Sequence, residues 1–451
     1  MTSTRDALRP PADAGMTLIE VVVALLVFAI VAVGIVGGMV TITHMTGDNR
    51  SRVIAANLAA GDIDLARAIG DPFKITGATS TRLISGRTYT IKRTVSWVSQ
   101  AGQDISCGSA TNLFFLRVHA AVTWTGQLLT TGPVVTDTLI APDGRVTDPT
   151  SGTVAVAVTG ADGLPMAGVT VTIVPTAGGR ALISQPAATG EDGCTYATKV
   201  APGVYSVSVS RTGFVDTTQD ATPSKPVTVV VGGTASASFQ FDAGATFPVT
   251  YAKNYTAGPA ALPTNLDTTF INSTAGLTLL SPSAASVVLH PFPSGYTAVA
   301  GALGATGGTT TCASVDPAAW GAGKVGAVQL LAGARAASVA AAPGGTAPDL
   351  DIPMGVVIVK ATGPGWLKAV SALPTRAGNP GCITGRTYSF GNVLKNGSVA
   401  VALPYGSWTL YSGNAAAQIT PVPAADLDTV TNAAPGGVTG PGSVTLDPRV
   451  P

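Results

Sequence analysis

Glu20 is a lone carboxylate at the head of a long apolar run, and it poses the first chemical question of this 451-residue sequence. No residue from Val21 to Val40 carries a charge, and about 20 apolar residues are enough for a helix to cross a hydrocarbon core of roughly 30 Å. A carboxylate in such a segment costs roughly 2.5–3.5 kcal/mol at the membrane centre and less near its ends. A cationic partner would offset that cost, so Glu20 is a candidate for a specific ion pair.

The residues before the apolar run argue against an ordinary secretory signal. Residues 1–15 are polar, and the small pair Ala14-Gly15 precedes the apolar segment, whereas a secretory signal has its small-residue cleavage site after that segment. A cut after Gly15 would therefore leave the apolar run on the mature protein.

This order of residues resembles the N-terminus of the type IV prepilin family, which comprises pilins and type II secretion pseudopilins. The residues that carry the resemblance are Gly15, Met16, Thr17, Leu18, Ile19 and Glu20. The resemblance implies that a prepilin peptidase cuts between Gly15 and Met16 and methylates the new amino terminus of Met16. It also implies an assembly role for Glu20, which would pair with the terminal ammonium group of a neighbouring subunit.

The resemblance further implies the partners and the location of the chain. The expected partners are prepilin peptidase, other pilin subunits that contact the N-terminal helix, and the membrane. The protein would be a single-pass cytoplasmic membrane protein before assembly and part of an extracellular cell-surface pilus afterwards.

The sequence predicts one long helix over residues 16–70, with its apolar part at residues 16–40. The sequence Gly70-Asp71-Pro72 provides a stop, because proline disfavours helix at the residue before it. Apolar residues recur at roughly helical intervals in the second half and predict that the helix continues there; they are Val53, Ile54, Leu58, Ile63, Leu65 and Ile69.

Beyond the helix, the alternation of β-branched and aromatic residues with polar ones predicts strands. In residues 71–142 the predicted strand segments are Arg82–Val98, Leu113–Trp124 and Pro133–Pro142. We expect a three- or four-stranded antiparallel sheet packed on the C-terminal half of the helix, as in a pilin globular domain. The predicted fold class is therefore α+β, with all-β sandwich-like domains after this unit.

Residues 152–243 resemble a carboxypeptidase-regulatory-like, prealbumin-like β-sandwich of seven strands. The resemblance is carried by the segment Leu164–Val169 and by Pro202-Gly203-Val204-Tyr205. Tyr196, Tyr205 and Phe214 are the expected core aromatics. Residues 244–451 read as a further β-rich domain, for which a second sandwich is one interpretation, with a last strand at Ser443–Leu446.

The four cysteines are Cys107, Cys194, Cys312 and Cys382, and no two of them have C-x-x-C spacing. An even number in a chain with a membrane-export segment suggests two disulfides. Three pairings are possible and the sequence does not choose among them. Cys312–Cys382 with Cys107–Cys194 is preferred here because it joins neighbours.

No catalytic constellation, metal site or cofactor is expected. The three histidines, His44, His119 and His290, are scattered and share no catalytic motif. The acidic pairs Glu191-Asp192 and Asp349-x-Asp351 lack the repeated ligands of a calcium loop.

A nucleic-acid partner is not expected either, because only 11% of residues are charged and the net charge is +1. One basic group near Tyr89 and Trp97 could hold a single strand, although a solvated strand face is the favoured interpretation; it comprises Arg82, Arg87, Lys92 and Arg93.

These observations favour a structural protein: a minor pilin, at the tip or in low abundance, of a type IV pilus-like filament. The first alternative is a type II secretion pseudopilin, which would use the same helix chemistry. The second is a pilus-borne adhesin that binds a carbohydrate or host ligand. The C-terminal region would then bind this ligand at the surface. Aromatic residues that could serve such an adhesin are Trp320, Trp366, Trp408 and Tyr411.

Overall fold

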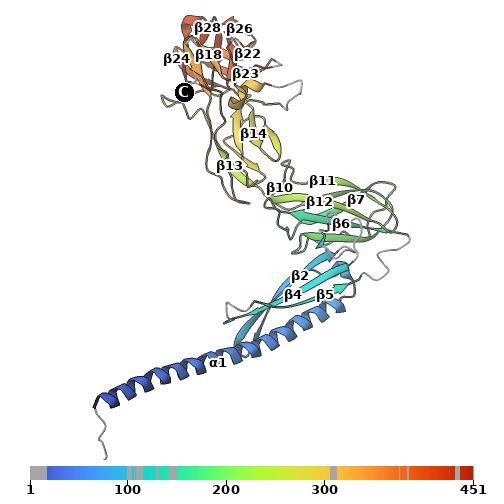
Figure 1. Cartoon of the computed structure of the whole chain (residues 1–451). Coiled ribbons are helices and arrows are strands. Elements are labelled where there is room, and N and C mark those ends of the chain that lie inside the picture. The colour runs from blue at the N-terminus through green and yellow to red at the C-terminus, as the bar shows by residue number, and fades with distance from the viewer. Residues whose placement is uncertain are drawn as a thin grey trace, which may run out of the picture. The chain divides into compact units, whose positions relative to one another are not determined.

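A computed structural model describes most of the chain (Figure 1). The described residues are 18–98, 104–105, 107, 115–127, 132–141, 150–304, 312–374, 376–382, 385–431 and 437–449, without the side chains of residues 40–45. The predicted leader at residues 1–15, and with it Gly15, lies outside the described residues, as does Met16. The chain divides into two compact units, residues 1–104 with 114–143 and residues 105–113 with 144–451.

The first unit begins with the long helix α1, Leu18–Ala68. Its end follows from the local sequence: the amides of Ile69 and Gly70 bond back to the carbonyls of Ala66 and Arg67, and Gly70 adopts φ +70°. Glycine takes this left-handed conformation without strain and so closes helices. The chain then enters a short 3₁₀ helix, η1 (Pro72–Lys74), and leaves the helical path.

A five-stranded antiparallel sheet completes the first unit. Its strands are β1 (Ala78–Ile84), β2 (Arg87–Val98), β3 (Asp104–Ile105), β4 (Phe115–Trp124) and β5 (Val134–Ile140), in the order β1-β2-β4-β5 with β3 beside β2. The expectation of a single strand segment at Arg82–Val98 was wrong, because Ser85 and Gly86 make a hairpin turn there, with φ of 51° and 76°. Positive φ at both central residues matches the right-handed twist of paired strands.

The helix packs on this sheet through small residues. The buried residues of α1 near its C-terminal end are Ala55, Ala59, Ile63 and Ala66, which recur every three or four positions and so share one face. The larger apolar residues of this part of the helix are divided: Ile54 and Leu58 are half-buried, whereas Val53, Leu65 and Ile69 are exposed. Alanine lets the helix backbone approach the sheet closely. The large buried side chains of this unit belong to the sheet; they are Tyr89, Trp97 and Trp124.

One ion pair fixes the helix to the sheet. Arg93 lies on the apolar face of β2, between the buried Ile91 and Val95. Its guanidinium binds both carboxylate oxygens of Asp62 on α1, at 2.7 and 2.5 Å, and both side chains are only 12–13% exposed. Arg93 is therefore a packing residue of the first unit.

The second unit contains a seven-stranded sandwich over residues 152–243. One sheet has the order β10-β12-β6-β8 and the other β11-β9-β7. The strands are β6 (Gly152–Thr159), β7 (Thr170–Ala177), β8 (Cys194–Val200), β9 (Gly203–Ser210), β10 (Phe214–Asp216), β11 (Ser224–Val229) and β12 (Thr234–Ala243).

Aromatic side chains and a buried tyrosine hydroxyl organise the core of this sandwich. Tyr205 is fully buried, as expected, and its hydroxyl donates to the carbonyl of Ala201 at 2.8 Å. Phe214 is half-buried and packs against this core, with its ring centre 5.5 Å from that of Phe241. Tyr196 is also half-buried but is not part of the core, so its expected role was wrong. Phe239 and Phe241 on β12 fill that role.

From residue 245 on, the described part of the second unit consists of strands, their connections and the short 3₁₀ turns η2, η3 and η4. Two sheets face each other in its C-terminal part: β24-β21-β27, and β23-β22-β25-β29-β28 with β26 on β25. The smaller sheets are β16-β13-β20, β15-β14-β17 and β18-β19. One continuous apolar core runs through this region, with Trp320 and Trp408 fully buried in it.

The bounds of these elements are as follows. They are β13 (Ala245–Tyr251), β14 (Thr268–Asn272), β15 (Gly276–Leu280), β16 (Ser286–Leu289), β17 (Thr297–Ala300), η2 (Ala313–Val315), η3 (Pro317–Ala319), β18 (Gly323–Val325), β19 (Val328–Leu330), β20 (Leu350–Ile352), β21 (Gly355–Ala361), β22 (Gly365–Ser371), β23 (Thr387–Leu394), β24 (Gly397–Leu403), β25 (Gly406–Gly413), β26 (Gln418–Pro421), η4 (Ala424–Asp426), β27 (Leu427–Thr431), β28 (Val438–Gly440) and β29 (Ser443–Leu446).

We predict that Asp62→Asn lowers the free energy of unfolding of the first unit by roughly 2–4 kcal/mol, because it leaves the largely buried Arg93 guanidinium without its counter-charge. Urea unfolding of the detergent-solubilised chain, followed by tryptophan fluorescence, measures the change. The matched control is Asp351→Asn, whose partner Lys253 is half-exposed, and it should leave unfolding unchanged. Equal effects of the two substitutions would contradict the assigned role of Arg93.

Candidate functional site

The N-terminal part of α1 is an apolar surface that none of the described residues covers. Leu18–Met39 is 22 residues long, and none of its most apolar window is buried. Leu18, Phe28 and Val33 are each 70–83% exposed. A helix of this length and composition can cross a membrane, and an apolar surface of this size needs either lipid or other protein around it.

Glu20 lies in the first turn of this helix. Together with Ile19, Val23 and Ala24, Glu20 lines a shallow recess on the helix surface. A carboxylate in the first turn interacts favourably with the positive end of the helix dipole. The structure therefore places one acidic group within an otherwise apolar surface, at the end of the helix that a mature N-terminus would occupy.

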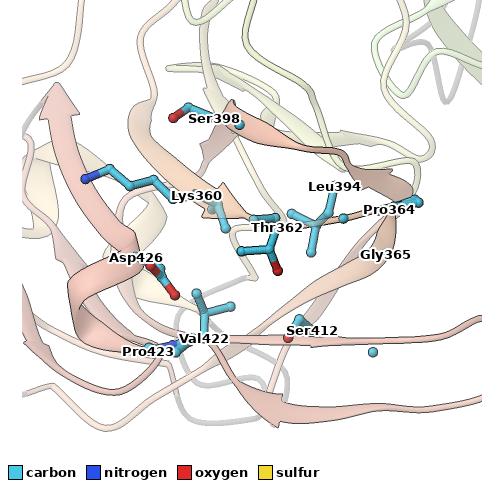
Figure 2. A pocket seen from close by; sticks show the side chains of 15 residues that line it. Lys360, Thr362, Pro364, Gly365, Leu394, Ser398, Ser412, Val422, Pro423 and Asp426 are labelled. Atoms are coloured by element: carbon cyan, nitrogen blue, oxygen red, sulfur yellow. The ribbon is translucent and has the colours of Figure 1, made fainter.

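A cavity of about 620 Å³ opens at one end of the two C-terminal sheets (Figure 2). Its apolar floor is formed by Val359, Leu394 and Val422, and polar side chains stand around the floor. Those labelled in Figure 2 are Lys360, Thr362, Ser398, Ser412 and Asp426.

These polar residues come from strand ends and turns that are far apart in the sequence. Lys360 is near the end of β21, Ser398 is at the start of β24, and Asp426 is in η4. Neither Lys360 nor Asp426 forms an ion pair with another residue in the described part of the chain. The sequence carried no signal for this cluster, because each of these residue types is common in exposed turns.

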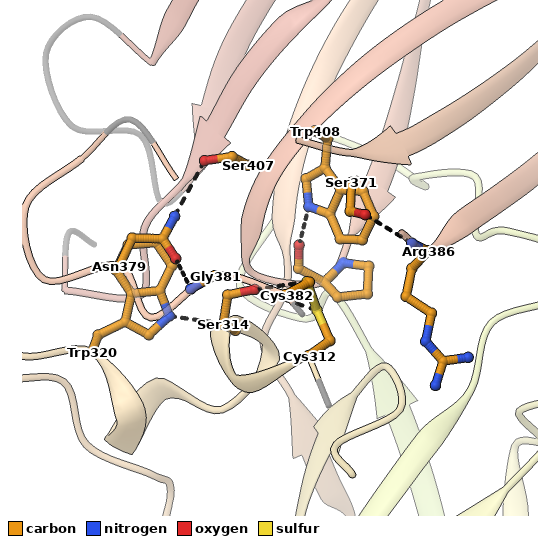
Figure 3. Close-up of a disulfide and its surroundings, with 11 residues drawn as sticks. Cys312, Ser314, Trp320, Ser371, Asn379, Gly381, Cys382, Arg386, Ser407 and Trp408 are labelled. Carbon is orange, nitrogen blue, oxygen red and sulfur yellow. Dashed lines mark hydrogen bonds between the residues drawn. A yellow bond between two sulfur atoms is a disulfide. The ribbon is translucent and has the colours of Figure 1, made fainter. Parts of the chain in front are cut away.

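Each cysteine is in a disulfide: Cys107 is bonded to Cys194 and Cys312 to Cys382. The first bond joins Cys107 to the start of β8, within the second unit. The second bond lies under two buried tryptophans (Figure 3). There Trp320 Nε1 donates to the carbonyl of Ser314 at 2.7 Å, and Trp408 Nε1 donates to that of Pro404 at 2.8 Å.

The aromatic residues considered for adhesion divide between core and surface. Trp320 and Trp408 are buried, and their ring N–H groups are used within the chain, so they cannot contact a ligand directly. Trp366 and Tyr411 are half-buried on neighbouring strands, β22 and β25. Tyr411 lies under the ammonium group of Lys368, 5.7 Å from its ring centre.

The described histidines have structural surroundings. His119 Nδ1 lies 2.6 Å from Asp137 across the β4–β5 pair. His290 is fully buried, its Nδ1 lies 3.0 Å from the carbonyl of Val215, and burial lowers its pKa. Among the described residues, no group of three or more His, Cys, Asp or Glu side chains could hold a metal ion.

The basic group on the first unit does not form one exposed surface. Arg93 binds Asp62, and Arg87 donates to the hydroxyl of Ser51 on α1 at 2.8 Å. Arg82 and Lys92 remain exposed on the sheet. Half of the group thus packs the sheet onto the helix.

Two family models match the sequence. The model described as the prokaryotic N-terminal methylation motif matches residues 11–36. This range includes Gly15, Met16 and Glu20 and continues into the exposed apolar part of α1. The chain carries a type IV pilin methylation motif.

The second match is the carboxypeptidase regulatory-like domain, over residues 153–242. These residues form the seven-stranded sandwich, β6 to β12. Both resemblances that the sequence suggested are thereby confirmed, as is the α+β fold class. Residues 243–451 lie outside both matches, and no curated protein matches the sequence.

Comparison with solved structures gives only distant similarity. The Bacillus anthracis TIE protein is 13% identical, with a TM-score of 0.19; the match covers 73% of this chain and 63% of that protein, which is less than two thirds. A streptococcal ancillary pilin is 12% identical, with a TM-score of 0.18; the match covers 49% of this chain and 73% of that one. BcpA, the major pilin subunit of Bacillus cereus, is 11% identical, with a TM-score of 0.18; the match covers 58% of this chain and 87% of that one. Scores this low carry no argument about this chain.

We predict that non-reducing peptide mapping recovers Cys107 joined to Cys194 and Cys312 joined to Cys382. Sequence separations of 87 and 70 residues correspond to roughly 4–5 kcal/mol per bond in the chain-entropy account. Reduction should therefore lower the melting temperature of the second unit. Recovery of either alternative pairing would contradict this structure.

Proposed function

We propose that this protein is a minor subunit of a type IV pilus-like filament. The observation that supports this most directly is a methylation motif joined without interruption to 22 residues of exposed apolar helix. Prepilin peptidase would cut between Gly15 and Met16 and methylate Met16. Before assembly the helix would anchor the chain in the cytoplasmic membrane, and after assembly it would pack among the helices of other subunits in a cell-surface filament.

Glu20 is the proposed assembly residue. Cleavage gives Met16 an α-ammonium group, and N-methylation leaves this group cationic. In a bundle of parallel helices, the Glu20 carboxylate of one subunit meets the terminal ammonium of the next. A paired charge is tolerated in a low-dielectric core where an unpaired one is costly, so the pair would fix the register between subunits.

A position at the tip, or at low abundance, is the proposed place in the filament. Three successive parts would project from the helix: the sheet of residues 71–142, the sandwich of residues 152–243 and the β-rich region of residues 244–451. Such bulk would obstruct dense packing along a shaft. The same size argues against a type II secretion pseudopilin, which remains the alternative with the same helix chemistry.

An adhesive role is the second candidate, and the cavity with Lys360 and Asp426 is the observation that favours it. A cation, a carboxylate and several hydroxyl groups stand around an apolar floor. This combination of donors, acceptors and an apolar surface suits a carbohydrate, whose rings carry hydroxyls at their edges and C–H groups on their faces.

We predict that Glu20→Ala is still cleaved and methylated but enters filaments at least tenfold less often, because the subunit has lost the proposed counter-charge. Glu20→Gln, which keeps the shape, should fail in the same way. Immunogold counting on isolated filaments, with N-terminal mass spectrometry of the membrane pool, measures both steps. The control is Glu191→Ala, which removes an exposed carboxylate from the second unit. Normal assembly of Glu20→Ala would contradict the pairing.

If the cavity serves adhesion, the detergent-solubilised chain should bind a defined set of glycans on an array, and Lys360→Ala with Asp426→Ala should remove that binding. Glycan binding that survives the double substitution would place the ligand elsewhere. Lys324→Ala, a substitution of an exposed lysine outside the cavity, is the control.

A further inference from the structure

A second cavity, of about 360 Å³, lies near the beginning of β21, whereas the larger cavity lies at the end of that strand. Its walls are mostly small aliphatic side chains, including Val299, Val315 and Ile352. The polar residues in its lining are few: Asn254, Arg335, Tyr405 and Thr431. An apolar cavity with a small number of convergent polar groups is the usual form of a small-molecule site.

Tyr405 is the informative residue of this cavity. It lies in the turn between β24 and β25, is only 4% exposed, and burial raises its pKa. Its hydroxyl makes no hydrogen bond with any residue that the structure describes. The hydroxyls of two other buried tyrosines, Tyr205 and Tyr296, donate to backbone carbonyls at 2.8 and 2.9 Å, whereas that of Tyr388 also has no partner among the described residues. Tyr405 differs from Tyr388 in that it lines the cavity, so a ligand there could supply the partner that buried hydroxyls normally have.

Arg335 also lines this cavity, and its side chain is 37% exposed. Its Nε and Nη2 bind the two carboxylate oxygens of the buried Asp316, at 2.8 and 2.5 Å. This bidentate contact fixes the plane of the guanidinium. It leaves Nη1 without a hydrogen-bond partner within the described part of the chain.

The other two polar residues of the cavity lining are Thr431 and Asn254. The buried hydroxyl of Thr431 makes no side-chain hydrogen bond to a described residue. The amide of Asn254 is already used, because it donates to the carbonyl of Met354 and accepts from the amide of Met354. No carboxylate residue is among the described residues of the lining.

We propose that this cavity binds a small carboxylate with a short aliphatic body. A carboxylate has two oxygens with about four acceptor sites, so it can accept from Tyr405, Arg335 and Thr431 together. The aliphatic part would pack against Val299, Val315 and Ile352. This inference goes beyond the proposed filament role and does not depend on it, since a chain that fails to assemble still contains the cavity.

The test uses butyrate as the probe and the intact chain in detergent. Saturation-transfer NMR should detect butyrate binding to the unaltered protein, whereas butyramide, its neutral counterpart, should bind at least tenfold more weakly. Absence of butyrate binding would overturn the proposal. Equal binding of butyramide would overturn the assignment of a carboxylate. Empty detergent micelles give the background signal.

Tyr405→Phe is the decisive variant, because it removes a hydroxyl that has no partner within the described chain. It should weaken butyrate binding at least tenfold and leave the melting temperature unchanged or higher. Unchanged affinity, or a lower melting temperature, would overturn the role given to this hydroxyl. Arg335→Lys keeps a cation beside Asp316 but loses the guanidinium fork, and it should weaken binding as well. Lys324→Gln, at an exposed lysine outside both cavities, should not affect it.

Discussion

An exposed apolar helix is the constraint on which the rest of this molecule depends. No described residue covers Leu18–Met39, and an apolar surface of this extent is unfavourable in water. The proposed function places this segment in a membrane or among the helices of other subunits. Within this surface Glu20 is the exception, and in the proposed account its carboxylate is what turns non-specific apolar packing into a defined register.

The first unit shows how one helix can serve two different surroundings. Towards its C-terminal end, α1 buries a row of alanines against the sheet, and the Arg93–Asp62 pair fixes that contact. Val53, Leu65 and Ile69 face away from the sheet and remain exposed. Polar and charged residues separate these exposed apolar side chains from one another and from the continuous apolar segment Leu18–Met39.

Features that depend on local chemistry could be predicted from the sequence. The stop at Gly70-Asp71-Pro72 and the last strand, Ser443–Leu446, follow from nearest neighbours along the chain. The hairpin turn at Ser85-Gly86 was missed, although Ser-Gly is itself a turn signal, because strand-forming residues precede and follow it directly. The alanine face was missed because apolar periodicity gives weight to large side chains, whereas close packing favours small ones. Tyr405, Arg335 and Thr431 could not be grouped at all, since only the tertiary fold brings them to one cavity.

The central claim is that the apolar helix is retained on a chain whose new amino terminus can pair with Glu20. Mass spectrometry of the N-terminal peptide from membrane or filament protein tests it most directly. The account predicts a mature chain that begins at Met16 and carries one N-methyl group. A chain that still begins at Met1, or one that has lost residues 18–39, would contradict it.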